Sequence, residues 1–154
     1  MIINILGTNR EKGFTLAELL VATAIISLLL TVSIPLFNRS LKEWQLETAA
    51  WQLATNIRLV QQMAVSGEDR HRTILFDPVN NLYRIRKDAV IISENKLPAG
   101  VTFASIAFAN NRLAFTLTGA PTASGDIVLQ NCYGSKYYIR VLPVTGRVKA
   151  GKTI

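Results

Sequence analysis

The sequence has almost none of the residues that crosslink a small protein. Its 154 residues include one cysteine, Cys132, and one histidine, His71. A single cysteine excludes a disulfide within the chain, and one cysteine with one histidine argues against a structural zinc site built within one chain. The length is enough for one domain with a modest hydrophobic core.

The sequence also lacks a recognisable catalytic set. His71 stands between two arginines with no nucleophile or metal-ligand spacing near it, so we interpret it as a solvated turn residue. Gly119 and Gly125 are not followed by the Gly-Lys-Ser/Thr of a phosphate-binding loop. Cys132 lies in a polar turn, where a bystander thiol is expected. We therefore predict a protein that is not an enzyme and has no metal, cofactor or small-molecule substrate.

Charge is scarce and mostly of one sign. Charged residues make up 18% of the chain against 49% hydrophobic residues, and the formal net charge is +7. The chain is too apolar for an intrinsically disordered protein. A chain that is both apolar and basic raises the question of where each property lies.

The hydrophobicity lies mainly in residues 14–37, which read FTLAELLVATAIISLLLTVSIPLF with Glu18 as the only charge. The uncharged part, residues 19–37, is close to the ~20 residues that cross a bilayer as a helix. Basic residues flank it almost equally on both sides, so charge counting alone does not set its orientation. A secretory signal peptide is the less favoured interpretation, because its apolar stretch is shorter and carries no such charge.

Glu18 is the informative residue of this run. An isolated carboxylate in hydrocarbon costs about 2.5–3.5 kcal/mol on insertion scales, so it needs compensation. Either Glu18 lies near the lipid headgroups and is hydrated, or it pairs with a cation buried in an assembly.

Residues 12–20, KGFTLAELL, followed by the apolar run, resemble the processing site of type IV pilins and pseudopilins. The resemblance implies that a prepilin peptidase cuts after Gly13 and that Phe14 becomes the N-methylated first residue. It implies that Glu18 meets the N-terminal amine of a neighbouring subunit during assembly. Pro35 falls where many members of the family carry a proline, and a proline removes a backbone hydrogen bond and kinks a helix.

The same resemblance implies a location. Residues 1–13 form a leader on the cytoplasmic side, residues 14–37 anchor the protein as a single-pass helix in the cytoplasmic (inner) membrane, and the rest lies outside. Membrane lipid is then the partner before assembly, and other pilin or pseudopilin subunits are the partners in the filament.

Residues 38–66 predict an amphipathic continuation of the helix, which would run from about 15 to 66. Apolar residues recur there at spacings of three and four, and Gly67 follows as a stop signal. Trp44 and Trp51 are seven residues apart and share a face, and we expect them to pack on the head or on another subunit rather than to form a ligand platform. The apolar stripe consists of Leu46, Ala50, Leu53, Ile57, Val60 and Ala64.

Residues 67–154 predict a globular head of antiparallel strands. Strand-like runs follow one another in hairpin-sized steps, with turns at 77–81 and 96–100 and a loop at 119–125. The fold class is therefore α+β, a pilin fold in which the amphipathic helix packs on a mainly antiparallel sheet. The expected strands are 73–76, 82–86, 90–92, 101–103, 113–117, 126–130, 136–142 and one that begins at Arg147.

Short segments of the head indicate which subgroup of the family the chain resembles. They are most similar to the H-type minor pseudopilins (GspH) and the related FimT minor pilins. Cys132 has no partner for the C-terminal disulfide of many major pilins, and Glu18 argues against the K-type tip pseudopilin. The segments are 97–103 (LPAGVTF), Phe115, Gly119, 125–129 (GDIVL), 138–141 (YIRV) and 146–148 (GRV).

Two functions remain open, and they are compatible with each other. One is a structural subunit of a type IV pilus-like or type II secretion filament. The other is a minor pilin that binds DNA for uptake in natural transformation, because no acidic residue follows Asp126 and a basic cluster does: Arg140, Arg147, Lys149 and Lys152. Cations of this kind can contact DNA phosphates.

The basic segment differs in one residue from the pattern of the FimT-like proteins that it resembles. FimT-like proteins that are linked to DNA uptake carry Gly-Arg-x-Arg, whereas residues 146–149 read Gly-Arg-Val-Lys. Lysine keeps the charge and loses the planar fork of arginine. The alternative interpretation is that Gly146 and Arg147 are only a turn into the last strand.

Overall fold

The computed structural model describes residues 13–67 and 72–152, so the predicted leader up to residue 12 and His71 lie outside the described residues. The chain divides into two compact units, one that ends at Asn38 and one that begins at Arg39. Each unit is described by itself.

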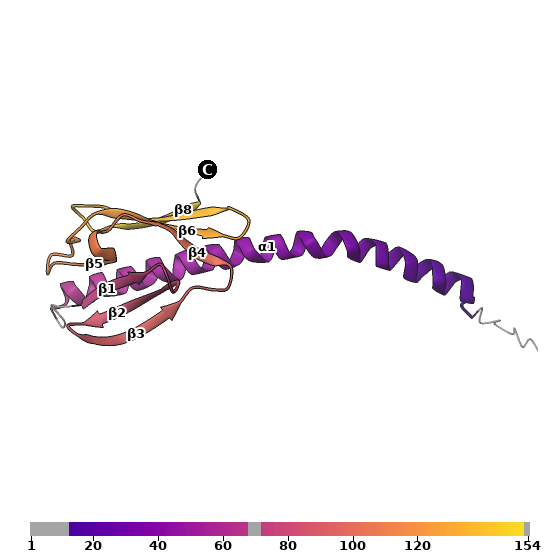
Figure 1. The fold of residues 1–154 in the computed structure, drawn as a ribbon, viewed down its shortest axis with the longest axis horizontal. Helices are drawn as coiled ribbons and strands as arrows, with labels where there is room; N and C mark the ends of the chain where they lie inside the picture. The colour runs from indigo at the N-terminus through magenta and orange to yellow at the C-terminus, as the bar shows by residue number, and fades with distance from the viewer. Residues whose placement is uncertain (1–12, 68–71, 153–154) are drawn as a thin grey trace, which may run out of the picture. The chain divides into compact units, whose positions relative to one another are not determined.

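One helix, α1 (Leu16–Val65), crosses from the first unit into the second (Figure 1). The predicted helix, 15–66, is confirmed to within one residue at each end. The helix continues through Pro35, and the predicted kink there stays a prediction. Within the described residues α1 is the one helix long and apolar enough to cross a membrane, and its most apolar 18-residue window has a hydropathy of 2.4 with no residue buried.

The few polar side chains of this apolar segment bond to their own helix. Four hydroxyl groups donate to backbone carbonyls three or four residues earlier, at 2.8–3.0 Å. Because each hydroxyl is satisfied locally, the segment can enter an apolar environment without a buried unpaired donor. The residues are Thr23, Ser27, Thr31 and Ser33.

The second unit is built on the C-terminal part of α1. All six residues of the predicted apolar stripe are buried, at 0–3% exposure, and Ala49 and Ala54 join them. The stripe is confirmed because a helix with apolar residues at this spacing has one face that must be covered.

The predicted antiparallel head is confirmed, and in the described residues it consists of two four-stranded sheets (Figure 1). The first sheet has the order β3-β2-β1-β5 and the second β4-β6-β7-β8. A 3₁₀ helix, η1 (Ala109–Asn111), precedes β5. The strands are β1 (Arg72–Asp77), β2 (Leu82–Lys87), β3 (Val90–Lys96), β4 (Val101–Ile106), β5 (Arg112–Ala114), β6 (Gly125–Asn131), β7 (Lys136–Val141) and β8 (Val148–Lys152).

Three strand boundaries differ from the expected ones. β3 and β4 continue to Lys96 and Ile106, because both stay paired with their neighbours beyond the apolar residues that marked them. The expected strand 113–117 is wrong in its second half. β5 ends at Ala114, and Phe115 forms an isolated bridge to Pro121 across the 119–125 loop.

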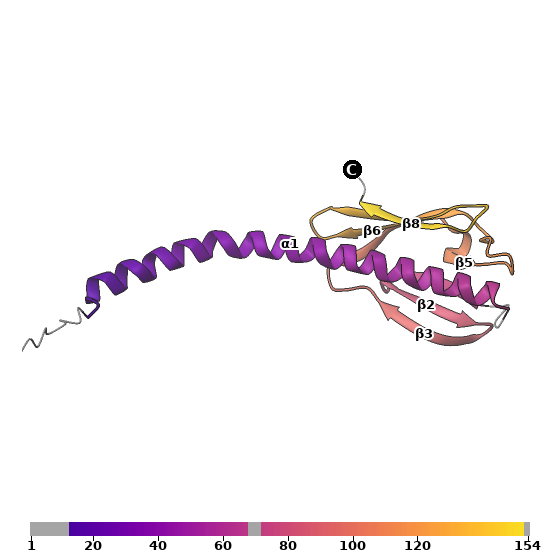
Figure 2. The same ribbon diagram turned by 180° about the vertical axis from the view of Figure 1, so that it is seen from behind.

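The C-terminal part of α1 runs between the two sheets. Figures 1 and 2 show β6 and β8 on one side of it and β2 and β3 on the other. The buried residues of the helix and of both sheets form one hydrophobic cluster, which lies within residues 46–148. The second unit therefore contains its whole core.

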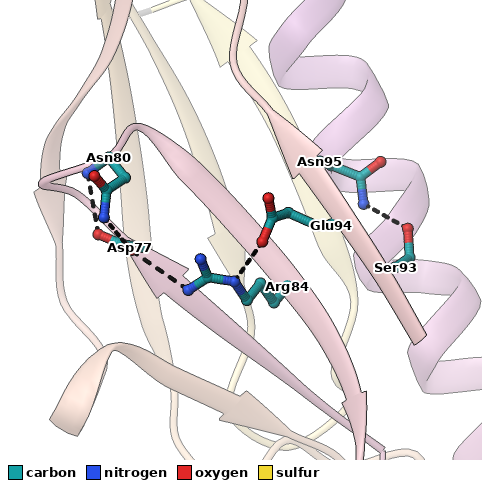
Figure 3. Close-up of polar contacts among 6 residues, drawn as sticks. All are labelled: Asp77, Asn80, Arg84, Ser93, Glu94 and Asn95. Carbon is teal, nitrogen blue, oxygen red and sulfur yellow. Dashed lines mark hydrogen bonds and ion pairs between the residues drawn. The ribbon is translucent and has the colours of Figure 1, made fainter. Parts of the chain in front are cut away.

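The outer face of the first sheet carries a neutralised polar cluster (Figure 3). The guanidinium of Arg84 donates to Glu94 at 2.6 Å and to Asp77 at 3.4 Å. The hydrogen bond to Glu94 raises the pKa of Arg84, and the Asn80 amides that donate to Asp77 lower the pKa of that carboxyl. Although Arg84 and Arg86 make this side of β2 basic in sequence, the Arg84 charge is matched by carboxylates.

Candidate functional site

The start of α1 is held by a capping box. The backbone N–H and the hydroxyl of Thr15 each donate to a carboxylate oxygen of Glu18 at 3.0 Å, and the Glu18 N–H donates back to the Thr15 hydroxyl at 3.2 Å. This reciprocal pair satisfies donors that the first turn of a helix leaves free. Sequence reasoning missed this function of Glu18, although Thr-x-x-Glu before an apolar run is its signature.

The predicted processing residues precede the cap directly. The Phe14 side chain is 85% exposed, and a Cβ on Gly13 would meet no atom within 4 Å. No side chain among the described residues, 13–67 and 72–152, therefore crowds Gly13, which is compatible with the predicted cleavage after it.

Two of the four predicted DNA-binding residues are paired with carboxylates. Arg140 binds both oxygens of Asp126, at 2.7–3.1 Å, and this hydrogen bonding raises the pKa of Arg140. The Lys152 ammonium lies 3.5 Å from a Glu43 oxygen. Their charges are largely balanced within the chain, so they add little to an anion-binding surface.

The other two, Arg147 and Lys149, are exposed and have no carboxylate partner among the residues the structure describes. Arg58 of α1 joins them. Its Nη2 donates to the Val148 carbonyl at 3.1 Å, and its guanidinium carbon lies 5.9 Å from the centre of the Trp51 ring. Sequence reasoning missed Arg58, because nothing in the sequence brings residue 58 beside residue 148.

These side chains line a groove of about 570 Å³ between α1 and the edge strand β8, which we call the α1–β8 groove. It holds three cations, two aromatic rings and two glutamine amides. Its lining residues are Trp51, Arg58, Gln61, Gln62, Tyr138, Arg147, Val148, Lys149 and Ala150.

Gly146, next to the groove, has a structural function. It adopts φ +63°, and a Cβ there would overlap the Gly119 carbonyl oxygen and the Gln61 amide nitrogen. Gln61 in turn donates to the carbonyls of Gly119 and Thr145, at 2.8 and 3.3 Å. Gly146 is thus required by the turn into β8, which supports the fold interpretation for this residue and leaves Arg147 exposed beside it.

The two tryptophans lie outside the core. Trp44 is 63% exposed and Trp51 43%. The head therefore leaves much of both rings uncovered, and packing of Trp44 on another subunit stays a prediction. In the parts of the chain that the structure describes, no group of three or more His, Cys, Asp or Glu residues is arranged to hold a metal. Cys132 is exposed in the turn between β6 and β7.

Comparison with known proteins gives the family. Residues 8–34 match the family model described as the prokaryotic N-terminal methylation motif. The chain is 31% identical over 140 residues to the competence protein ComGD of Bacillus subtilis (strain 168), which covers 91% of this chain and 93% of that protein. The chain belongs to the type IV pilin-like proteins.

This pilin-like protein also has the fold of a solved relative. The minor pseudopilin EpsH of the type 2 secretion system of Vibrio cholerae superposes with a TM-score of 0.55 at 10% identity, over 70% of this chain and 97% of that one. The α+β pilin fold is confirmed. The protein is a minor pilin or pseudopilin of a type IV pilus-like system, a family of structural subunits. Its motif implies processing by a prepilin peptidase, anchoring in a membrane and assembly with other pilin subunits.

Proposed function

We propose that this pilin-like protein is a minor pilin of a competence filament, where it acts as a structural subunit. The observation that carries the proposal is the 31% identity to a competence protein along 91% of the chain. The EpsH likeness, at 10% identity, supports the fold alone and does not favour secretion. Membership of the H-type and FimT-like subgroup is compatible with that fold and belongs to the proposal.

The proposed course of assembly follows from the first unit. The leader, residues 1–13, is cut after Gly13, Phe14 is N-methylated, and residues 14–37 hold the protein in the cytoplasmic membrane with the head outside. Glu18 then pairs with the N-terminal amine of a neighbouring subunit as the helix leaves the lipid. The exposed Gly13–Phe14 bond and the locally satisfied hydroxyls of α1 support this course.

Processing has a direct test. Mass spectrometry of the protein purified from membranes is expected to show a chain that begins with N-methylated Phe14. The same analysis in cells without a prepilin peptidase provides the control and is expected to show the leader still attached. A mature chain that begins at any other residue contradicts the proposed cleavage.

The filament system has a separate test. Deletion of the gene is expected to reduce transformation by added DNA to background, while the pattern of secreted proteins stays unchanged. A copy of the gene at another locus should restore transformation. Normal transformation together with a loss of secreted proteins would instead assign the subunit to a type II secretion filament.

Direct contact with DNA is a second candidate function. The observation that favours it is that Arg147 and Lys149 are exposed without a carboxylate partner among the described residues, whereas Arg140 and Lys152 are paired. Uncompensated surface cations bind the phosphate backbone with an affinity that falls steeply as salt is added.

A further inference from the structure

We propose that the α1–β8 groove is a binding site for a phosphodiester strand, and that Arg58 and Trp51 of α1 are part of it. The inference rests on the second candidate function, DNA contact, and adds the place and the residues of that contact. Neither α1 residue belongs to the basic C-terminal cluster.

The charge in the groove comes from two elements that lie side by side. Arg58 enters from α1, and Arg147 and Lys149 enter from β8 and the turn before it. The Arg58 bond to the Val148 carbonyl fixes its guanidinium beside the strand, which leaves its other N–H groups for a ligand. Three cations that line one groove, with no carboxylate among the lining residues, favour a polyanion over a neutral ligand.

The aromatic rings make the groove more specific than a basic surface. Trp51 and Tyr138 line it together with the cations, and Arg58 lies over the Trp51 ring. Proteins that bind single-stranded nucleic acid usually combine cations along the sugar-phosphate backbone with aromatic rings on which the bases stack. The 570 Å³ volume lies within the range of built ligand sites.

Two sources can supply the strand, single-stranded DNA or one backbone of a duplex. The two sources are expected to make different contacts with the Trp51 ring. A single strand can place a base on the ring, whereas a duplex keeps its bases stacked and offers only its phosphates.

The first experiment uses the two tryptophans as reporters. The full chain is placed in nanodiscs of phosphatidylcholine, a lipid without net charge, and titrated with a short oligothymidylate or with a duplex of the same length. In Trp44→Phe the remaining Trp51 is expected to lose emission on binding the single strand. In Trp51→Phe the remaining Trp44, outside the groove, is expected to respond little.

The second experiment removes one charge at a time. Arg58→Gln is expected to lower DNA affinity about tenfold and to reduce the salt dependence by about one phosphate contact. Lys96→Gln removes the same charge from an exposed position on β3 in the other sheet and is the matched control, with little change expected. Thermal unfolding of Arg58→Gln and the Trp51 signal of the Trp44→Phe chain separate lost binding from lost folding.

The outcomes show whether DNA binds in the α1–β8 groove, binds elsewhere on the protein or does not bind. A loss in Arg58→Gln with quenched Trp51 supports a single strand in the groove, and the same loss with duplex but unchanged Trp51 supports a duplex backbone there. If Arg147→Gln and Lys149→Gln abolish binding while Arg58→Gln behaves like Lys96→Gln, the groove is overturned and DNA contact stands. If neither DNA binds at low salt, both are overturned.

Discussion

Replacing Glu18 with alanine is expected to leave the protein in the membrane and to reduce its incorporation into filaments roughly 100-fold or more. The apolar segment from residue 19 onward is unchanged, so insertion does not depend on this carboxylate. If Glu18 pairs with the N-terminal amine of a neighbouring subunit, as we propose, the substitution leaves that amine buried and unpaired in the filament. Breaking a buried pair in this way costs about 3–5 kcal/mol at each interface.

The capping box creates a second explanation, and glutamine separates the two. Alanine removes both the negative charge and the acceptor for the Thr15 N–H. Glutamine removes the charge and keeps a carbonyl that can accept the same hydrogen bond, because Glu and Gln both serve in capping boxes. If pairing with an amine is the function of Glu18, both variants should fail to assemble.

The measurement is the amount of each variant in sheared filaments relative to the amount in membranes, with the wild-type chain as reference. Assembly of Glu18→Gln at the wild-type level, with failure of Glu18→Ala, would show that Glu18 acts by capping the helix. Wild-type assembly of both would contradict any function of this side chain in the filament.

Gly146→Ala is expected to lower the free energy of unfolding of the head by about 3 kcal/mol or more. A non-glycine residue at positive φ costs about 1 kcal/mol. The rest comes from the overlap of the new Cβ with the Gly119 carbonyl, which is backbone and cannot move aside without opening the 119–125 loop.

Gly134 provides the matched control for this substitution. It also has a positive φ, +84°, but a Cβ there meets no atom within 4 Å. Gly134→Ala should therefore show the backbone cost alone. Residues 39–154 contain the whole core, so thermal unfolding of that piece is a suitable measurement, with a shift of ~4 °C expected for each kcal/mol. Equal shifts in the two variants would refute the close approach at Gly146.

The periodic elements could be predicted from the sequence, because their physical cause is local. The apolar stripe of α1 repeats at the helical spacing from Leu46 to Ala64, and each of its six members is buried. The hairpin of β1 and β2 was predicted from two apolar runs on either side of Asp77-Pro78, a turn that admits few alternatives.

The division into two sheets could not be predicted, because it depends on where three connections lead. The turn at Leu97–Gly100 takes the chain from the edge of the first sheet to β4 in the second, and η1 then brings it back to β5. The segment after β5, which includes the 119–125 loop, returns the chain to β6 in the second sheet. In sequence these connections look like ordinary turns and loops between neighbouring strands. Strand pairing between distant segments is decided by packing on both sides of α1, which periodicity does not report.

The charged site was predicted in part for the same reason. Arg147 and Lys149 are exposed, and DNA binding by them stays a prediction. The pairing of Lys152 with Glu43, which the sequence did not indicate, joins residues more than a hundred positions apart. Sequence reasoning did not single out Arg58, because it lies on the polar face of a helix, where solvated charged residues are expected. Its contact with Val148 exists only after β8 has folded against α1.

That contact also bears on how such a protein avoids aggregation. β8 is the edge strand of its sheet. An exposed edge strand has unpaired backbone groups, which can pair with the same strand of another molecule. Arg58 donates to the Val148 carbonyl, and Lys149 places an exposed charge on the same strand. At the other sheet's edge, the bulge in the β2–β3 pairing disturbs the regular ladder. For a protein whose family assembles into filaments, these features disfavour unwanted pairing of subunits through the edge strands β8 and β3.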